Sequence, residues 1–278
     1  MISKAQLKTY RSLHQKKYRD ELGLFLAEGS KCVDELRKAF ELEALITEEE
    51  VGRTAIEQLS SLRTPQGVIA VFRLPSFSPQ DGLSASETSG LCSFSEQSER
   101  SFSPKDGLIL ALDGIQDPGN LGTIIRTCDW FGVRDIVCSL DTADCFNPKV
   151  VQATMGALAR VRLHYVDLPQ WLTANSQQLT ANGQQPIAIY GTLLEGRNMY
   201  EVLNKSVFYQ RSGLSSISER SERSIIIMGN EGNGISPEVR RLITHPIRIP
   251  SYPPEAETSE SLNVAIATAI VLAEFRRP

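Results

Sequence analysis

One stretch of this sequence, LDGIQDPGNLGTIIRTCDWFG at residues 112–132, combines acids, amides, one arginine and four glycines. The stretch begins at the end of an apolar run and continues into a helical pattern. It contains no histidine, no lysine and no spacing typical of metal ligands. The side chains that could do chemistry here are therefore carboxylates, an amide and a guanidinium, carried by Asp113, Asp117, Asn120 and Arg126.

The arginine of this stretch is expected to point away from the core. Helical periodicity from about Asn120 to Gly132 gives one apolar stripe, and Arg126 falls roughly opposite to it. The stripe consists of Ile124, Cys128 and Phe131. A solvated arginine would explain this position as well as a functional one, although ligand loops of open α/β sheets do occur at such strand ends.

A second candidate loop, SIIIMGNEGNGISPEV, follows another apolar strand. Its glycines, Gly229, Gly232 and Gly234, allow positive φ or a close approach of the backbone to a ligand. Glu231 lies inside the turn. Ser236 and Pro237 predict the start of a helix, as N-cap and first helical residue. By itself, a glycine-rich turn is more often a structural connection than a site.

A third candidate segment is the C-terminal helix SLNVAIATAIVLAEF, which is apolar nearly all round and is expected to be buried on most sides. Ser261 and Asn263 are its polar exceptions and must find hydrogen-bond partners. A capping role explains Ser261 easily and Asn263 less well. Another strand is expected to end just upstream, in RIPSYPPEAETSE. With the strand ends before the first two candidate segments, three strand ends then converge on one candidate pocket.

The elements around these loops predict a mostly parallel sheet. From Gly107 onward, apolar strand candidates alternate with helical segments, a pattern typical of sheets covered on both faces. The candidates are LILALD, RDIVCSL, VRLHYV, PIAIYG, SIIIMG and HPIRIP. Residues 1–75 differ, because a helical start, an amphipathic SKCVDELRKAF and three strand-like runs indicate a small mixed α/β domain.

A serine-rich segment separates these two regions. Residues 76–103 contain few large apolar side chains, so we expect a flexible linker. Near-repeats within it, and between GLCSFSEQSERS at Gly90 and GLSSISERSERS at Gly213, indicate insertions in surface loops. A phosphorylated regulatory segment is the alternative. The expected domains are 1–75, a linker at 76–106, and 107–278.

Composition narrows the classes of function. The net charge of −4 argues against non-specific coating of nucleic acid. Five cysteines without Cys/His spacing suggest neither a disulfide framework nor a zinc site, so no metal is expected. No apolar run is long enough to span a bilayer, so we expect no membrane association and a cytoplasmic location.

Positive charge is nevertheless concentrated at the N-terminus. The first nineteen residues contain six basic side chains and no acid, which could form a face that binds phosphate or merely a solvated helix face. These residues are Lys4, Lys8, Arg11, Lys16, Lys17 and Arg19.

Taken together, the three candidate segments resemble the three motifs of the SpoU (TrmH) family of RNA ribose 2′-O-methyltransferases, in the SPOUT superfamily. The motifs read NLGTIIR at 120–126, MGNEGNGIS at 228–236 and IPSYPPEAETSESLNVAIATAI at 249–270. FNPKVVQATMGALARV also looks like the helix between them. QKKYRDELGLFLAEG resembles part of the family's small substrate-binding domain, which is similar to certain RNA-binding ribosomal proteins.

The resemblance implies a trefoil-knotted α/β methyltransferase domain, usually homodimeric, that acts on rRNA or tRNA. It also implies that S-adenosylmethionine is bound in loops, by Gly229, Ile249 and Leu262, with Thr192 as a less certain addition. The positions associated with catalysis are Asn120, Arg126, Glu231, Ser261 and Asn263. The loop 250–261 departs from the compact form common in the family, because it is longer and more acidic.

The chemistry of such an enzyme follows from its reactants. A sulfonium methyl donor needs no metal, but a ribose hydroxyl is a poor nucleophile until its proton is removed or its developing charge is stabilised. If Arg126 acts as the base, its charge must be suppressed when substrate binds; otherwise it orients the adjacent phosphate and stabilises the oxyanion. We expect the second role, which leaves the destination of the proton open. Two alternatives remain: an RNA-binding pseudoenzyme, and a nucleotide-binding oxidoreductase, for which the G-x-G-x-x-G fingerprint is missing.

Overall fold

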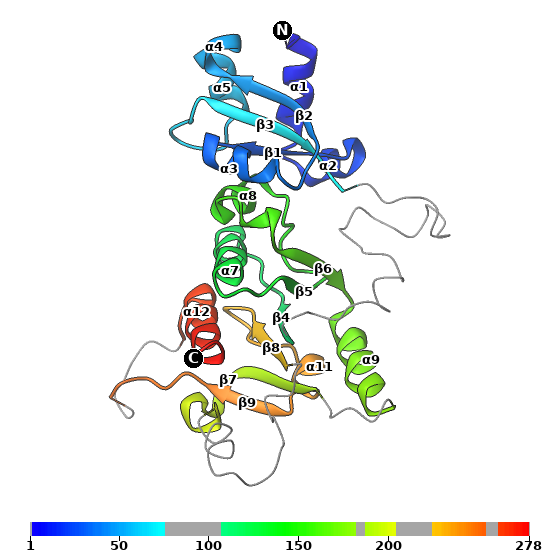
Figure 1. Ribbon diagram of the computed structural model, residues 1–278, viewed down its shortest axis with the longest axis vertical. Helices are drawn as coiled ribbons and strands as arrows, with labels where there is room; N and C mark the ends of the chain where they lie inside the picture. Colours follow the sequence, from blue (N-terminus) through cyan, green and yellow to red (C-terminus); the bar gives the residue numbers. More distant parts are fainter. Residues whose placement is uncertain (1, 76–106, 182–186, 204–223, 254–260, 278) are drawn as a thin grey trace. The chain divides into compact units, whose positions relative to one another are not determined.

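The computed structural model describes residues 2–75, 107–181, 187–203, 224–253 and 261–277 (Figure 1). The chain divides into two compact units. The first combines Met1–Gln97, Asp117–Arg126 and Ala143–Arg162, and the second combines Ser98–Gln116, Thr127–Thr142 and Leu163–Pro278. The expected serine-rich linker, its repeat at Gly213 and most of the acidic loop lie outside the described residues.

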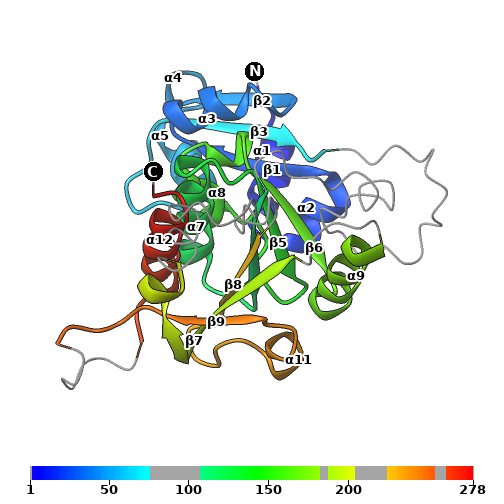
Figure 2. The ribbon, with the colours of Figure 1, turned by 60° about the horizontal axis from the view of Figure 1, so that its bottom comes forward.

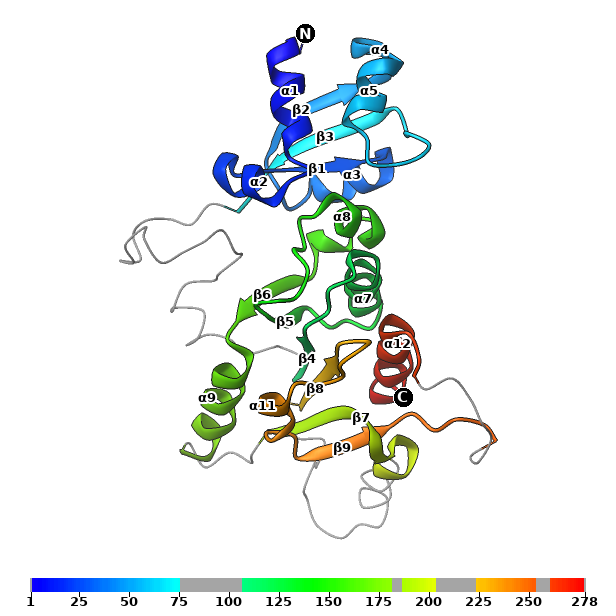
Figure 3. The same cartoon turned by 180° about the vertical axis from the view of Figure 1, so that it is seen from behind.

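The first unit is built on a three-stranded antiparallel sheet in the order β1-β3-β2 (Figure 3). The strands are β1 (Leu24–Glu28), β2 (Leu42–Thr47) and β3 (Val68–Arg73). The helices of the same region are α1 (Lys4–Ser12), α2 (Lys16–Leu22), α3 (Ser30–Leu36), α4 (Glu48–Val51) and α5 (Arg53–Leu59). This is the small mixed α/β arrangement expected from the sequence.

One face of this sheet packs against α1 and α5. Alternate strand residues point to this side, because successive side chains of a strand face opposite ways. They form a buried apolar cluster with residues of both helices. The cluster contains Tyr10, Leu13, Leu24, Leu26, Ile46, Ile56, Leu59, Ile69 and Val71.

The opposite face of the sheet is closed by a segment distant in sequence. Phe25 stacks on Phe72 with ring centroids 5.6 Å apart, and Phe146 lies 4.7 Å from Phe25. Phe146 comes just before α8 (Pro148–Thr154), which is followed by the short 3₁₀ helix η2 (Ala157–Ala159). Because both faces are covered, all five residues of β1 are buried.

The second unit contains a six-stranded sheet in the order β6-β5-β4-β8-β7-β9 (Figure 2). The described registers of β4 with β5 and β8, and of β7 with β8 and β9, are all parallel. The strands are β4 (Leu108–Asp113), β5 (Asp135–Ser139), β6 (Arg162–Val166), β7 (Ala188–Asn198), β8 (Ser224–Gly229) and β9 (His245–Arg248). All six expected strands are confirmed, although β7 continues well beyond Gly191.

Helices complete the second unit. Side chains of α9 (Leu168–Ala181) and α11 (Pro237–Arg240) share a buried cluster with one face of β4 and β8. The cluster includes Ile109, Ala111, Leu168, Leu172, Ile225, Ile227 and Val239. α12 (Val264–Phe275) contacts β8 (Figure 1). The fold class is confirmed, while the knot stays a prediction.

The C-terminal helix is less buried than its composition suggested. Val264, Thr268, Val271 and Leu272 are buried, but Ile266 is 55% exposed. The expectation of burial on most sides is therefore wrong for this side of α12. Within the part of the chain that the structure describes, every helix is too short or too polar to span a lipid bilayer.

Candidate active site at the carboxyl ends of the strands

In the glycine-rich turn after β8, the backbone folds back against Gly229. A Cβ built on Gly229 would lie 2.4 Å from the carbonyl carbon of Gly234, so no side chain fits there. The backbones of Asn230 and Gly234 pair across the turn, and Gly234 has a φ of +69°. The two glycines are thus required by close approach and by conformation, respectively.

Asn230 holds this turn and links it to β4. Its Oδ1 accepts from the backbone N–H groups of Gly232 and Asn233 at 2.8 and 3.1 Å, and its Nδ2 donates to the carbonyl of Gly114 at 2.7 Å. No role was predicted for Asn230. An Asx pattern, in which the side chain caps the N–H groups two and three residues on, is the sequence signal that could have suggested one.

Two further polar contacts join the carboxyl ends of neighbouring strands. Asp113 Oδ2, at the end of β4, accepts from the backbone N–H of Ser236 at 2.7 Å. Ser139 Oγ, at the end of β5, accepts from the N–H of Gly114 at 2.8 Å and donates to Asp141. Asp113 therefore orients the start of α11, where Ser236 occupies the expected N-cap position without a side-chain capping bond.

The catalytic candidates Glu231 and Asn263 lie together in this unit. Asn263 Nδ2 is 3.4 Å from Glu231 Oε1, and both residues are exposed. Asn263 Oδ1 also caps α12 by accepting from the N–H groups of Ala265 and Ile266 at 3.0 and 3.3 Å. The sequence favoured Ser261 as the cap, which is wrong, because Ser261 precedes the N-cap by two residues.

The expected cofactor residues differ in their surroundings. Thr192 is half-buried, and its hydroxyl donates to the carbonyl of Ile227 at 3.2 Å, which ties β7 to β8. Ile249, just after β9, is half-buried. Leu262 is 47% exposed and precedes the cap of α12. Gly229 ends β8, Ile249 follows the end of β9 and Leu262 precedes the cap of α12, whereas Thr192 lies within β7.

Asn120 and Arg126 belong to the first compact unit, on helix α7 (Pro118–Trp130). The helix begins two residues before the expected start, and Asp117 Oδ1 accepts from the N–H of Asn120 at 2.8 Å. Ile124 and Ile125 are fully buried whereas Arg126 is exposed. The expectation that Arg126 points away from the core is confirmed.

The N-terminal basic residues divide into two groups. Lys4, Lys8, Arg11, Lys16 and Lys17 are exposed. Arg19 is not, because its side chain is only 2% exposed and forms an ion pair with Asp144 at 2.5 Å. The expectation that Arg19 belongs to a solvent-facing basic surface is wrong.

The cysteines of the described segments are buried and form no disulfide: Cys32, Cys128, Cys138 and Cys145. Burial raises the pKa of the Cys32 thiol to about 11, and the backbone N–H of Gly156 partly opposes this shift. Among the described residues, no three His, Cys, Asp or Glu side chains are grouped so that they could hold a metal ion.

Comparison with known protein families identifies the chain. Residues 107–273 match the family model described as the SpoU rRNA Methylase family. The chain belongs to this family. Residues 4–70 separately match the MRM3-like substrate binding domain, so the SpoU region is preceded by a region with its own family resemblance. The relationship inferred from the three sequence motifs is confirmed.

Several relatives and solved structures match this SpoU protein over nearly its whole length. A 23S rRNA (guanosine(2553)-2′-O)-methyltransferase of Bacillus subtilis, RlmP, is 28% identical over 98% of this chain and 96% of its own. The AdoMet-bound rRNA methyltransferase of Sinorhizobium meliloti has a TM-score of 0.72 and 29% identity, covering 100% of this chain and 97% of its own. A TrmH-family protein from Porphyromonas gingivalis has a TM-score of 0.72 and 35% identity, with 100% and 99% covered.

Proposed function

We propose that this SpoU protein transfers the methyl group of S-adenosylmethionine to a ribose 2′-hydroxyl of rRNA or tRNA. The observation that carries the proposal is the likeness to an AdoMet-bound rRNA methyltransferase, which extends over nearly the whole of both chains at 29% identity and a TM-score of 0.72. The likeness to RlmP, whose name specifies 2′-O-methylation, supports the position of the transfer.

The residues at the strand ends fit such a cofactor. The space that a side chain would need at Gly229 is already filled by the turn, so the backbone there is held closely and presents peptide groups rather than side chains. We assign the cofactor to the peptide groups of Gly229, Ile249 and Leu262, with Thr192 bracing β7 against β8 nearby. S-adenosylmethionine supplies a methyl group activated by an adjacent sulfonium.

The acceptor chemistry is assigned to Arg126. An arginine is a fork of five donors that suits a phosphate or a developing oxyanion. Exposed on α7, Arg126 can bind the phosphate beside the target ribose and stabilise negative charge on its 2′-oxygen. We assign Asn120 to the orientation of the same substrate.

The remaining catalytic candidates orient the other reacting groups. Glu231 accepts from the amide of Asn263, so each of these side chains limits the rotamers of the other. In the proposed mechanism they and Ser261 hold the ribose hydroxyl and the loop before α12. Glu231 is an exposed carboxylate, a type of group that can act as a general base toward the hydroxyl.

The proposal includes partners and location. rRNA is the substrate class that the relatives' names indicate. We propose that RNA is bound by the region matched to the MRM3-like substrate binding domain, through its exposed lysines and Arg11. We further propose a homodimer, a cytoplasmic location, and the domain limits 1–75, 76–106 and 107–278.

The test is transfer of a tritiated methyl group from S-adenosylmethionine to rRNA and tRNA isolated from cells that lack the gene. Mapping of 2′-O-methyl sites with and without the gene then identifies the nucleotide. Binding of S-adenosylmethionine and RNA without any transfer would instead support an RNA-binding pseudoenzyme. Transfer to a base atom would contradict the assignment to the ribose.

A further inference from the structure

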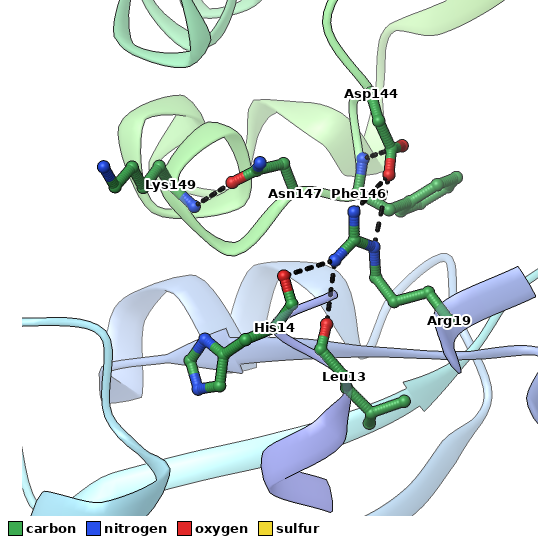
Figure 4. Close-up of polar contacts among 7 residues, drawn as sticks. All are labelled: Leu13, His14, Arg19, Asp144, Phe146, Asn147 and Lys149. Carbon is green, nitrogen blue, oxygen red and sulfur yellow. Dashed lines mark hydrogen bonds and ion pairs between the residues drawn. The ribbon is translucent and has the colours of Figure 1, made fainter. Parts of the chain in front are cut away.

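The first compact unit contains a buried arginine whose guanidinium binds groups of the protein itself. Arg19 lies near the end of α2, in the region matched to the substrate binding domain, and Asp144 lies in the region matched to the SpoU family. The Nε and Nη2 atoms of Arg19 donate to Asp144 Oδ2 at 3.2 and 2.5 Å (Figure 4). The pair thus joins two segments that the family models assign to different domains.

Both partners of the ion pair are fixed by further hydrogen bonds. Arg19 Nη1 donates to the carbonyls of Leu13 and His14 at 2.8 and 3.1 Å, so it also holds the turn between α1 and α2 (Figure 4). Asp144 Oδ1 accepts from the N–H of Phe146 at 2.9 Å, two residues before the start of α8. The geometry is therefore specific in a way that a pair of mobile surface charges is not.

Apolar contacts extend the junction on the same side. Phe146 packs on Phe25 and Phe40 with ring centroids 4.7 and 6.0 Å apart. Cys32 Sγ, from α3, lies 3.8 Å from the carbonyl oxygen of Val151 in α8. A Cβ on Gly156 would lie 2.5 Å from Glu35 Cβ, so α3 also approaches η2 closely.

The same segment supports the helix that carries the catalytic arginine. A Cβ on Gly122 of α7 would lie 2.4 Å from Ala153 Cβ and 2.8 Å from the carbonyl oxygen of Val150. Helices α7 and α8 therefore pack closely at Gly122, against Ala153 and the backbone of Val150. Contacts run from the substrate-binding region through α8 to Gly122, four residues before Arg126.

We propose that Arg19 and Asp144 are positioning residues, which dock the substrate-binding region on α8 so that bound RNA is presented to Arg126. This inference rests on the proposed function, because it assigns RNA to that region and substrate chemistry to α7. It predicts that loosening the pair impairs methyl transfer without impairing the binding of either substrate. Arg19 itself, being buried, contacts no phosphate.

Cys32 provides a direct measure of docking, because it lies at the junction and is only 3% exposed. Its burial raises the pKa of the thiol to about 11, so little thiolate exists at pH 8. Release of α8 from α3 would expose the sulfur and move its pKa back towards the ordinary value. Both changes accelerate alkylation.

The experiment compares Arg19→Met and Asp144→Asn with the unsubstituted junction and with Arg53→Met. All proteins carry Cys92→Ser, which removes the fifth cysteine of the sequence, outside the described residues. Arg53→Met is the control, because it removes an exposed arginine ion pair from α5 without touching the junction. Iodoacetamide labelling of Cys32 is followed by peptide mass spectrometry. Single-turnover transfer is measured on rRNA from cells lacking the gene, and binding of that rRNA and of S-adenosylmethionine is measured separately.

We expect labelling of Cys32 to rise at least tenfold in both junction variants and the single-turnover rate to fall at least tenfold. Both dissociation constants should stay within twofold of wild type, and Arg53→Met should change neither labelling nor rate. Asp144→Asn, which keeps the side-chain shape, decides the matter if Arg19→Met does not fold.

Three results would overturn the inference. Faster labelling with an unchanged rate would mean that docking does not position the RNA. Unchanged labelling would mean that the pair does not hold the junction. If the transfer rate fell only as much as RNA affinity fell, the pair would be needed for the fold of the RNA-binding region and not for positioning. If wild type transfers no methyl group, the proposed function fails and the positioning role with it, while Cys32 labelling still reports on docking.

Discussion

The side-chain amide of Asn263 contacts Glu231 through its nitrogen and caps helix α12 through its oxygen. Its nitrogen is 3.4 Å from Glu231 Oε1, and its oxygen accepts from the N–H groups of Ala265 and Ile266. A residue expected to act in catalysis is therefore also structural. Substitutions can separate these two roles because each uses a different atom.

Asn263→Ala should lower the free energy of unfolding by about 1 kcal/mol, the usual cost of removing a side-chain N-cap. Asn263→Asp keeps an oxygen at the cap and should keep the stability, but it removes the donor and places a second carboxylate beside Glu231. We therefore expect Asp at this position to reduce methyl transfer more than stability. Urea denaturation and the methylation assay together distinguish the two effects, and equal stability of Asn263→Ala and wild type would contradict the capping role.

Arg126→Ala should fold normally, since the side chain is exposed and the helix packs through Ile124 and Ile125. It should bind S-adenosylmethionine as wild type does and lose about 10²-fold in turnover, the typical effect of removing a donor that stabilises developing charge. Arg134→Ala, which removes another exposed arginine, is the matched control. Near-wild-type turnover of Arg126→Ala would refute the assigned role.

Gly229→Ala should disrupt the turn after β8, because the added Cβ would meet the backbone of Gly234 at 2.4 Å. We expect a loss of about 1–3 kcal/mol in stability, as for other overpacked sites, and at least a tenfold weaker affinity for S-adenosylmethionine. Gly232→Ala is the control in the same turn, since its Cβ would be 3.5 Å from the nearest atom, Asn230 Oδ1. Calorimetric titration and thermal melting measure both effects; equal affinities of the two variants would remove Gly229 from the cofactor site.

Lys16→Gln combined with Lys17→Gln should weaken RNA binding and flatten its salt dependence. If each lysine contacts one phosphate, the slope of log affinity against log salt should fall by about 0.7–0.9 per lysine. Arg19 is left in place because it is buried against Asp144. Affinity for S-adenosylmethionine is the internal control, and an unchanged slope would show that these lysines are merely solvated.

Asp20→Asn should stabilise the protein at neutral pH. Partial burial, and then the neighbouring Asp144 carboxylate, raise the pKa of Asp20, while Lys16 and Arg19 partly offset this. A raised pKa in the folded state means that folding favours the protonated form, so ionisation above the ordinary aspartate range destabilises the fold. The melting temperature of the variant should exceed that of wild type at pH 7, and the difference should vanish near pH 3. Asp34→Asn controls for the loss of one negative charge, and a difference independent of pH would exclude ionisation as the cause.

Apolar periodicity was sufficient to locate the strands. LEALIT, LILALD and SIIIMG coincide with β2, β4 and β8, because short apolar runs bounded by polar or glycine residues are typical of strands. Helical periodicity also predicted that the side chain of Arg126 is exposed. The continuation of β7 to Asn198 could not be predicted, since Arg197 and Asn198 pair with β9 only after an irregularity in register that follows Thr192.

Errors arose where a residue's partner was distant or where two residues competed for one role. Arg19 stands in a run of basic residues that looks solvent-exposed, and nothing local indicates a carboxylate 125 positions away. Ser261 and Asn263 are both good N-cap residues, and only the backbone conformation at Asn263 determines which one caps α12. The apolar composition of α12 indicated a buried helix, but composition alone could not show that Ile266 is on its exposed side.

The separation between Arg19 and Asp144 has a consequence for synthesis of the chain on the ribosome. All three strands of the N-terminal sheet have been made once Arg73 is added, yet the aromatic ring that covers Phe25 arrives only with Phe146. During that interval this face of the sheet has Phe40 but lacks the cover of Phe146, and Arg19 lacks its carboxylate. Nascent chains that stop between these points therefore expose a phenylalanine surface of the kind that chaperones bind and that drives association of incomplete proteins.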